Sequence, residues 1–239
     1  MASQQWADLS AALSDALALN VPPIAITFTE TVPAGVDAFD APMPDPLPDG
    51  RTGRVAAGCV FWMHGTANTF STVAEDHGNC SVGSLTHGFK TIDEIAGNSD
   101  VAALLDSGWV TMDVVPQIPT VQDKPEAVVY GPLSDTPVDP DVVLVRVNGK
   151  QLMVLHDAVP NLRIEGKPQC HIIAIAKEQG VPAASVGCAL SRVRTGMSAH
   201  EMTCAIPAST LGNVVETIQR NAGADTAVAR YAAVDAQRF

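Results

Sequence analysis

The sequence contains few basic side chains and no long apolar run, and these two absences narrow the class of protein. Lysine and arginine together number 14, against 26 aspartates and glutamates, which gives a formal net charge of −12. This charge repels nucleic-acid phosphates and anionic lipid headgroups, so neither is expected as a partner. No stretch approaches the roughly 18 apolar residues of a membrane span, and no basic and apolar leader opens the chain. We therefore expect a soluble, cytoplasmic protein.

Motifs that identify common enzymes are missing as well. The sequence has no P-loop, no Rossmann glycine fingerprint and no G-x-S-x-G elbow, which removes the simplest nucleotide and hydrolase assignments. It also lacks the short C-x₂-C pairs of zinc knuckles and ferredoxins. Five cysteines are an odd number and fit poorly with a fully paired disulfide framework. We expect reduced thiols, which a protein usually retains for metal ligation or for reactivity.

Apolar residues make up 46% of the 239 residues, which is enough for the core of one compact domain over residues 1–239. Apolar runs rich in β-formers predict strands at residues 24–28, 110–115, 127–130 and 142–147. Helical periodicity predicts helices at 6–17, 54–76, 92–105, 150–159 and 209–221, with a helical alanine-rich tail after them. A loop with five prolines spans residues 33–48. This pattern predicts an α/β or α+β fold, with a mixed sheet flanked by helices.

The two halves of the chain, 1–135 and 136–239, share a loose plan. Each half has an apolar strand, then a cysteine near a helix, Cys59 or Cys170, and then a cysteine in a loop, Cys80 or Cys188. A Ser-Val-Gly triplet follows Cys80 but precedes Cys188, so a strict alignment fails. An ancient duplication is one interpretation of this plan.

The densest polar cluster covers residues 71–88. It combines Asp76, His77, Cys80 and His87 with three glycines, which allow the backbone to approach a ligand closely. This combination predicts a segment that lines a site, and the alternative is a well-hydrogen-bonded turn.

A second cluster, residues 185–202, places two of the few basic residues, Arg192 and Arg194, beside Cys188, with Glu201 close behind. An arginine there would hold an anionic substrate or lower the pKa of a thiol. A surface ion pair is the alternative.

Five motifs in order carry a resemblance over nearly the whole chain: residues 18–26, the Cys59 helix, residues 79–83, residues 140–144 followed by 151–153, and residues 187–201. With these motifs the sequence resembles the family called domain of unknown function 169. The resemblance brings no reaction with it. It implies that Cys59, Cys80, Cys170 and Cys188 occupy the cysteine positions of the family. The fifth cysteine, Cys204, lies in an apolar segment and is expected to be a buried small hydrophobe.

Three functional hypotheses remain open. In the first, Cys59, Cys80, Cys170 and Cys188 together bind a metal cofactor, a [4Fe–4S] cluster or a zinc ion, since both suit four thiolates. The protein would then be a cluster-dependent oxidoreductase or lyase acting on a small, anionic molecule. A haem or single-metal site on His64, His77 or His171 is a variant.

The second hypothesis is a metal-free enzyme with Cys80 as nucleophile. His77 or His87 would be its base and Asp76 the orienting acid, with Arg192 as a substrate clamp and Glu201 as a further catalytic candidate. The third hypothesis is a non-catalytic binding protein whose cysteines pack in the core. A homo-oligomer that packs through the alanine-rich residues 222–236 is compatible with all three.

Overall fold

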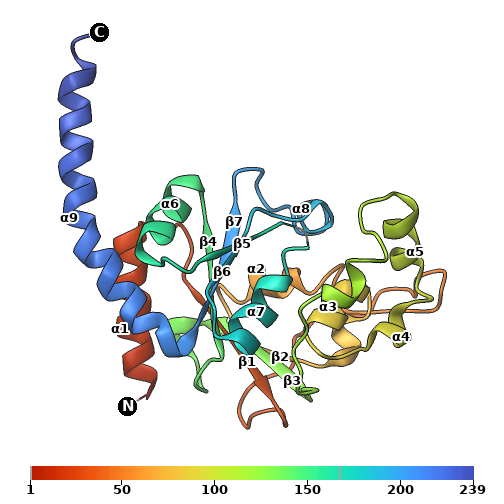
Figure 1. Ribbon diagram of the computed structural model, residues 1–239. Coiled ribbons are helices and arrows are strands. Elements are labelled where there is room, and N and C mark those ends of the chain that lie inside the picture. Colours follow the sequence, from red (N-terminus) through yellow and green to blue (C-terminus); the bar gives the residue numbers. More distant parts are fainter. Residues whose placement is uncertain (1, 167) are drawn as a thin grey trace.

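The computed structural model describes residues 2–166 and 168–239. In this part of the chain a mixed seven-stranded sheet runs through the centre of the molecule, in the order β2-β3-β1-β4-β7-β6-β5 (Figure 1). Only β5 and β6 pair in parallel; every other neighbouring pair described is antiparallel. The strands are β1 (Ile24–Thr29), β2 (Phe70–Thr72), β3 (Ala127–Pro132), β4 (Val142–Val147), β5 (Arg163–Glu165), β6 (Ala183–Ser185) and β7 (Met202–Pro207). The structure therefore confirms the α/β class.

Helices cover both faces of this sheet. The α-helices are α1 (Ala2–Leu17), α2 (Cys59–His64), α3 (Ser81–Thr86), α4 (Ile92–Ile95), α5 (Ser99–Asp106), α6 (Gly149–Ala158), α7 (His171–Gln179), α8 (Ala189–Thr195) and α9 (Leu211–Ala236). Short 3₁₀ helices are η1 (Ala74–His77), η2 (Val115–Gln117), η3 (Leu133–Asp135) and η4 (Ala208–Thr210).

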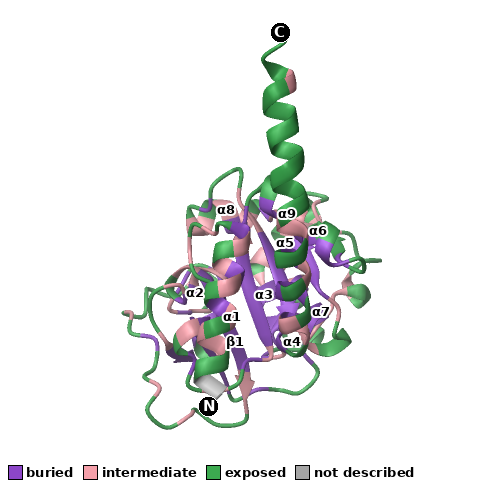
Figure 2. Ribbon diagram, turned by 90° about the vertical axis from the view of Figure 1, so that its left-hand side faces the viewer, coloured by how far each residue is buried: buried purple, intermediate pink, exposed green. Residues whose placement is uncertain are grey.

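The strand β4 shows why the sheet is buried on both sides. Successive side chains of a strand point to opposite faces. Val143 and Val145 accordingly join the core formed with α1, α6 and α9, whereas Val142 and Leu144 join the core formed with α2 and α7. All four are fully buried, and Figure 2 shows the strands as a buried layer between the helices. A continuous apolar run is what a strand covered on both faces requires.

The helices α1 and α9 pack against each other on the first face of the sheet. Leu13 is fully buried there, and the Gln151 side chain donates hydrogen bonds to the carbonyls of Leu17 (3.1 Å) and Ala18 (2.8 Å) at the end of α1. The first turns of α9 bury Leu211 and Ile218. Its C-terminal turns extend away from the sheet and are exposed (Figures 1 and 2).

The two halves of the chain pass through the sheet in a corresponding order. Outward from the central antiparallel pair β1–β4, the neighbours are β3 and then β2 on one side, and β7 and then β6 on the other. In the chain, a helix with a cysteine at its start lies between the central strand and the outer strand of each half: α2 with Cys59 between β1 and β2, and α7 with Cys170 between β4 and β6. After the outer strand comes a second cysteine and a helix, Cys80 with α3 or Cys188 with α8.

Two local predictions were wrong. Residues 110–115, expected as a strand, form turns that lead into η2. No described strand pairs with this segment, and without a partner its apolar residues do not form a strand. The long helix expected over 54–76 is instead α2, β2 and η1. Its apolar spacing reflects burial from several directions rather than one helical face. Within the described residues, no helix combines the length and the apolar character needed to cross a membrane.

Candidate functional site

Four cysteines from four separate segments line one small cavity. Cys59 is the first residue of α2, and Cys80, Cys170 and Cys188 are the N-cap residues of α3, α7 and α8. All four are free thiols, and the cavity between them has a volume of about 30 Å³. The fifth cysteine, Cys204, is fully buried in the core on the opposite face of the sheet, as its apolar surroundings predicted.

The packing of the helices explains why these cysteines meet. Helix α2 of the first half contacts α8 of the second, and α3 of the first half contacts α7 of the second. Each contact therefore brings the start of one helix in the first half close to the start of one in the second. The fold thereby brings together cysteines that are 129 positions apart (Cys59 and Cys188) and 90 positions apart (Cys80 and Cys170), which is why no short cysteine motif is visible.

Burial is the main cause of the pKa shifts of Cys59, Cys80 and Cys170. It raises the pKa of Cys59 to about 12 and that of Cys170 well above its usual value, and the neighbouring cysteines add to both shifts. Burial also raises the pKa of Cys80, although a hydrogen bond from the Gly83 backbone and the charge of Arg194 act in the opposite direction. Without a cation Cys59, Cys80 and Cys170 are protonated at neutral pH. A bound metal would supply the charge that stabilises the thiolates.

A chain of polar side chains leads to one of the sulfurs. The Gln169 side-chain amide donates a hydrogen bond to Ser191 Oγ (2.5 Å), and Ser191 Oγ donates to Cys59 Sγ (3.0 Å). Gln169 and Ser191 are buried and both line the cavity. Ser191 belongs to the second polar cluster, but no sequence pattern indicates a bond from Ser191 or Gln169 towards Cys59, because both lie far from Cys59 along the chain.

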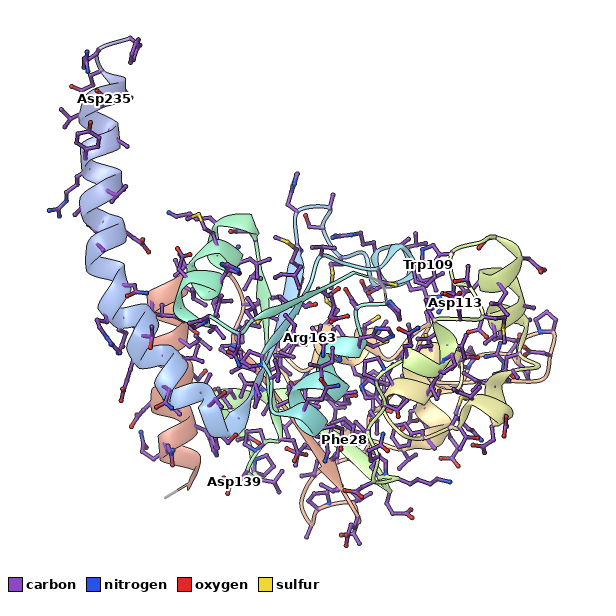
Figure 3. The ribbon with its side chains drawn as sticks, viewed as in Figure 1. Phe28, Trp109, Asp113, Asp139, Arg163 and Asp235 are labelled. Atoms are coloured by element: carbon purple, nitrogen blue, oxygen red, sulfur yellow. The ribbon has the colours of Figure 1, made fainter. Side chains whose placement is uncertain are left out.

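His87 also lines the cavity, at the C-terminal end of α3. Its Nδ1 lies 2.9 Å from the Gly83 carbonyl oxygen, which can only accept, so the proton is on Nδ1. Its Nε2 is buried and has no hydrogen-bond partner among the described residues. Burial lowers the pKa of His87 to about 4, so the ring is neutral at pH 7. Trp109, labelled in Figure 3, contributes to the same wall from the segment after α5.

Two of the candidate catalytic residues lie near the cavity but outside its lining. His77 is buried, its Nε2 lies 3.0 Å from Thr72 Oγ1, and its ring packs against Phe61. Burial, together with His87, lowers its pKa well below the usual value. Asp76 forms an ion pair with Arg54 (2.7 Å) and accepts a hydrogen bond from the Val73 backbone. The Cys80 backbone N–H donates to the His77 carbonyl (3.3 Å), but among the described residues no hydrogen bond joins the His77 ring to the Cys80 thiol, as a base and its nucleophile would require.

The other two candidates, Arg192 and Glu201, hold the local chain. Arg192 donates to the carbonyls of Val186, Ser198 and Glu201, and its guanidinium packs so tightly on Gly187 that a Cβ there would lie 2.4 Å from Nη2. The Glu201 carboxylate forms an ion pair with Arg146. The arginine that lines the cysteine cavity is Arg194.

The histidines of the haem or single-metal variant are dispersed. His64 packs edge-on against Phe39, and His171 follows Cys170 on α7. Neither lines the cysteine cavity. In residues 2–166 and 168–239, no group of three or more His, Cys, Asp or Glu side chains is arranged to hold a single metal ion.

The cysteine cavity still provides a suitable donor set for a cluster. Four soft thiol ligands from four helix starts match the ligand number of [4Fe–4S] sites. A volume of about 30 Å³ accommodates only one or two waters, so a cluster requires the cysteine side chains to rotate outward.

Fold and site together define an α/β protein with a four-cysteine cavity on one face of its sheet. The chain belongs to the family domain of unknown function 169, described as uncharacterised ArCR, whose family model matches residues 12–217. No curated protein and no solved structure matches the chain.

Proposed function

We propose that the protein binds an iron–sulfur cluster through Cys59, Cys80, Cys170 and Cys188. The observation that supports this most directly is their convergence on one cavity from four segments, while Cys204 packs alone in the opposite core. Buried packing cysteines have no reason to gather, since each would serve as a small hydrophobe wherever it lay. The convergence of four thiols on one cavity therefore supports a common ligand for all four.

A cluster suits the geometry better than one zinc ion. A tetrahedral zinc site places every sulfur about 2.3 Å from one point. The described side chains form no such single-ion arrangement. In a four-iron cluster each thiolate would bind a different iron, so the four sulfurs would be farther from one another than around a single zinc ion. Each cysteine could then bind from its own side of the cavity. Zinc is the alternative if the cysteines close on a smaller centre.

The surroundings favour a redox or substrate-transforming role over a purely structural one. Hydrogen bonds to the sulfur ligands and burial tune the reduction potential of a cluster. The Ser191 hydroxyl already donates to Cys59 Sγ, and Gln169 holds that hydroxyl in place. An open pocket of about 590 Å³ adjoins the site and shares Arg194 with it. We therefore favour a cluster-dependent oxidoreductase or lyase acting on a small molecule.

Single substitutions of the cysteines test this proposal. Cys59→Ser, Cys80→Ser, Cys170→Ser and Cys188→Ser should each lower bound iron and the visible absorption of anaerobically reconstituted protein by more than half. A hydroxyl is a poor replacement for a thiolate ligand. Cys204→Ala is the matched control, because this buried cysteine lies in the other core, and it should retain the iron content of the wild type.

The control also separates loss of metal from loss of fold. Cys204→Ala removes a buried sulfur and should lower stability by about 1–2 kcal/mol. If it lost iron as completely as the four cavity variants, the cavity would have no special role. Equal iron content in all five variants would contradict the assigned ligands, and rapid alkylation of Cys80 in an iron-free protein would favour the nucleophile.

A further inference from the structure

Three buried polar atoms without partners gather on the wall of the cysteine cavity. Among the described residues, His87 Nε2, Gln169 Oε1 and Arg194 Nη1 are buried and make no hydrogen bond, and all three residues line this cavity. A buried polar atom without a partner bears its full desolvation cost, so each such atom calls for an explanation. One residue comes from the end of α3, one precedes α7, and one lies on α8. Their convergence indicates a polar ligand.

The neighbours of each atom define what that ligand must offer. The Nδ1 proton of His87 is used by the Gly83 carbonyl, so Nε2 is an acceptor. The Gln169 amide nitrogen is used by Ser191, so Oε1 is an acceptor too. Arg194 supplies the opposite, a charged donor. The complementary ligand therefore carries a negative group for the arginine and an O–H or N–H donor for the two acceptors.

Arg194 connects the cavity to an opening large enough for such a ligand. It also lines the open pocket of about 590 Å³, within the usual range of small-molecule sites. Ala56 and Asn79 line that pocket, and Ala57 and Cys80, the next residues along the chain, line the cavity. The two spaces therefore lie on either side of the same two chain segments.

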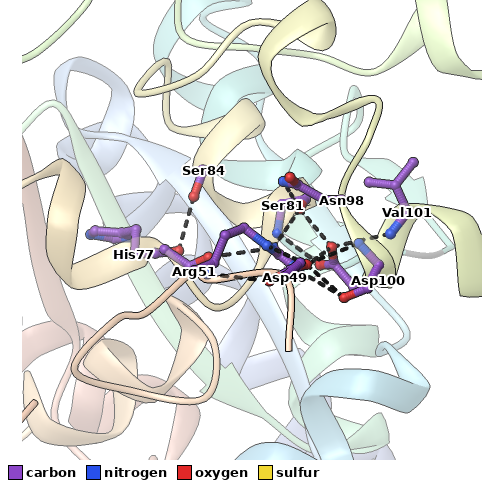
Figure 4. A network of polar contacts seen from close by, with 10 residues as sticks. Asp49, Arg51, His77, Ser81, Ser84, Asn98, Asp100 and Val101 are labelled. Atoms are coloured by element: carbon purple, nitrogen blue, oxygen red, sulfur yellow. Dashed lines mark hydrogen bonds and ion pairs between the residues drawn. The ribbon is translucent and has the colours of Figure 1, made fainter. Parts of the chain in front are cut away.

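The other arginines of the open pocket are already neutralised. Arg51 forms ion pairs with Asp49 (2.8 Å) and Asp100 (3.1 Å), within the polar network of Figure 4. Arg54 is paired with Asp76. Arg194, in contrast, forms no ion pair with any of the described residues.

Asp45 also lines the open pocket, but it is exposed to solvent, which screens its charge. Arg194 is thus the positive group available to a ligand that reaches the cysteines.

We propose that this site binds a small hydroxycarboxylate, with its carboxylate on Arg194 and its hydroxyl donating to His87 Nε2 or Gln169 Oε1. The inference rests on the proposed function in taking the cysteines as the reactive centre beside this ligand. The hydroxyl end lies at the cavity, and the remainder of the molecule extends into the open pocket. Recognition through buried acceptors rejects an analogue that lacks the hydroxyl, because the acceptors then stay unpaired.

Calorimetry with matched pairs of acids tests the proposal. Lactate should bind wild-type protein at least about tenfold more tightly than propionate, and malate more tightly than succinate. Arg194→Gln should weaken lactate binding at least about tenfold, with partial recovery in Arg194→Lys. Arg230→Gln, on the exposed part of α9, is the control and should bind as the wild type. Gln169→Met and His87→Phe should bring the lactate-to-propionate ratio towards one.

Equal binding of lactate and propionate, or unchanged binding in Arg194→Gln, would overturn the proposal, as would no binding of any acid at millimolar concentration. Tighter binding of inorganic phosphate than of lactate would overturn the hydroxycarboxylate. If the Gln169 or His87 variant does not fold, the Arg194 pair decides alone. Iron is measured on the same samples. Iron-free protein with Arg194-dependent binding contradicts only the cluster, and iron-loaded protein without binding contradicts only the pocket.

Discussion

His77 and His87 lie in the core beside the cysteine cavity, with their ring centroids 5.4 Å apart. Both rings are almost completely excluded from solvent, and burial lowers both pKa values. Each ring also uses one nitrogen for a local contact, His77 with Thr72 and His87 with Gly83. The two histidines are therefore neutral residues whose protonation would oppose the folded state.

This pair predicts a loss of stability in mild acid. The pKa of His87 falls from 6.5 to about 4 in the folded chain. The unfolded chain therefore binds more protons in that window, and stability present above pH 6.5 is lost as the pH falls towards 4. In metal-free protein, the wild type should lose about 2 kcal/mol more unfolding free energy than His87→Gln between pH 7 and pH 5. Urea titrations at the two pH values measure this, and equal losses would mean that His87 is not buried as a neutral ring.

Single residues also show how far the sequence leads to the site. The four cavity cysteines could be selected from five through the family resemblance, whereas composition alone does not separate them, because Cys59 lies in a segment as apolar as that of Cys204. Arg194 could not be separated from Arg192, because which arginine faces the cavity depends on the turn of α8 and on the carbonyls that bind Arg192. Gln169 acquires its role only from a partner 22 positions away.

Among the elements, strands covered on both faces were the most predictable. The continuous apolar run of β4 identifies it without knowledge of its partners, β1 and β7. The strands β2, β5 and β6 have three residues each, too few for a period to be visible. They depend on pairing with neighbours, β2 with β3, β6 with β7, and β5 with β6. Because β2 is too short to be recognised in the sequence, the segment 54–76 that contains it was predicted as one helix.

Helix α9 divides into a docked and an undocked part. Leu211, Val214, Val215 and Ile218 are buried, whereas almost every residue after Gly223 is exposed. Removal of residues 224–239 should change the free energy of unfolding by less than about 1 kcal/mol and leave iron binding intact. Ile218→Ala, on the docked part, should cost about 2–5 kcal/mol. Urea titrations compare the two, and a larger loss from the truncation would show that the exposed turns have a partner, as the oligomer prediction expects.

Across the whole molecule, the correspondence between the two halves accounts for the number of cysteines at the site. Each half places one cysteine before a helix on the same face of the sheet and a second after its outer strand. The helix contacts between halves then bring the four together. The duplication that would explain this order stays a prediction.

The net charge of −12 opposes the approach of an anion, so the proposed ligand site depends on the local charge of Arg194, which the ion pairs of the described residues leave unneutralised. The proposed ligand pocket and the cysteine cavity share Arg194, so the proposal places binding and reaction on the same side of the molecule. The other face, with α1, α6 and α9, serves as the structural core.

The iron content and visible spectrum of the protein purified without oxygen test the central claim most directly. The account predicts a brown protein with about four irons per chain that bleaches in air or with a strong reductant. It also predicts that the iron is lost when the cavity cysteines are replaced. A colourless protein that contains neither iron nor zinc, even after reconstitution with iron and sulfide, would contradict it.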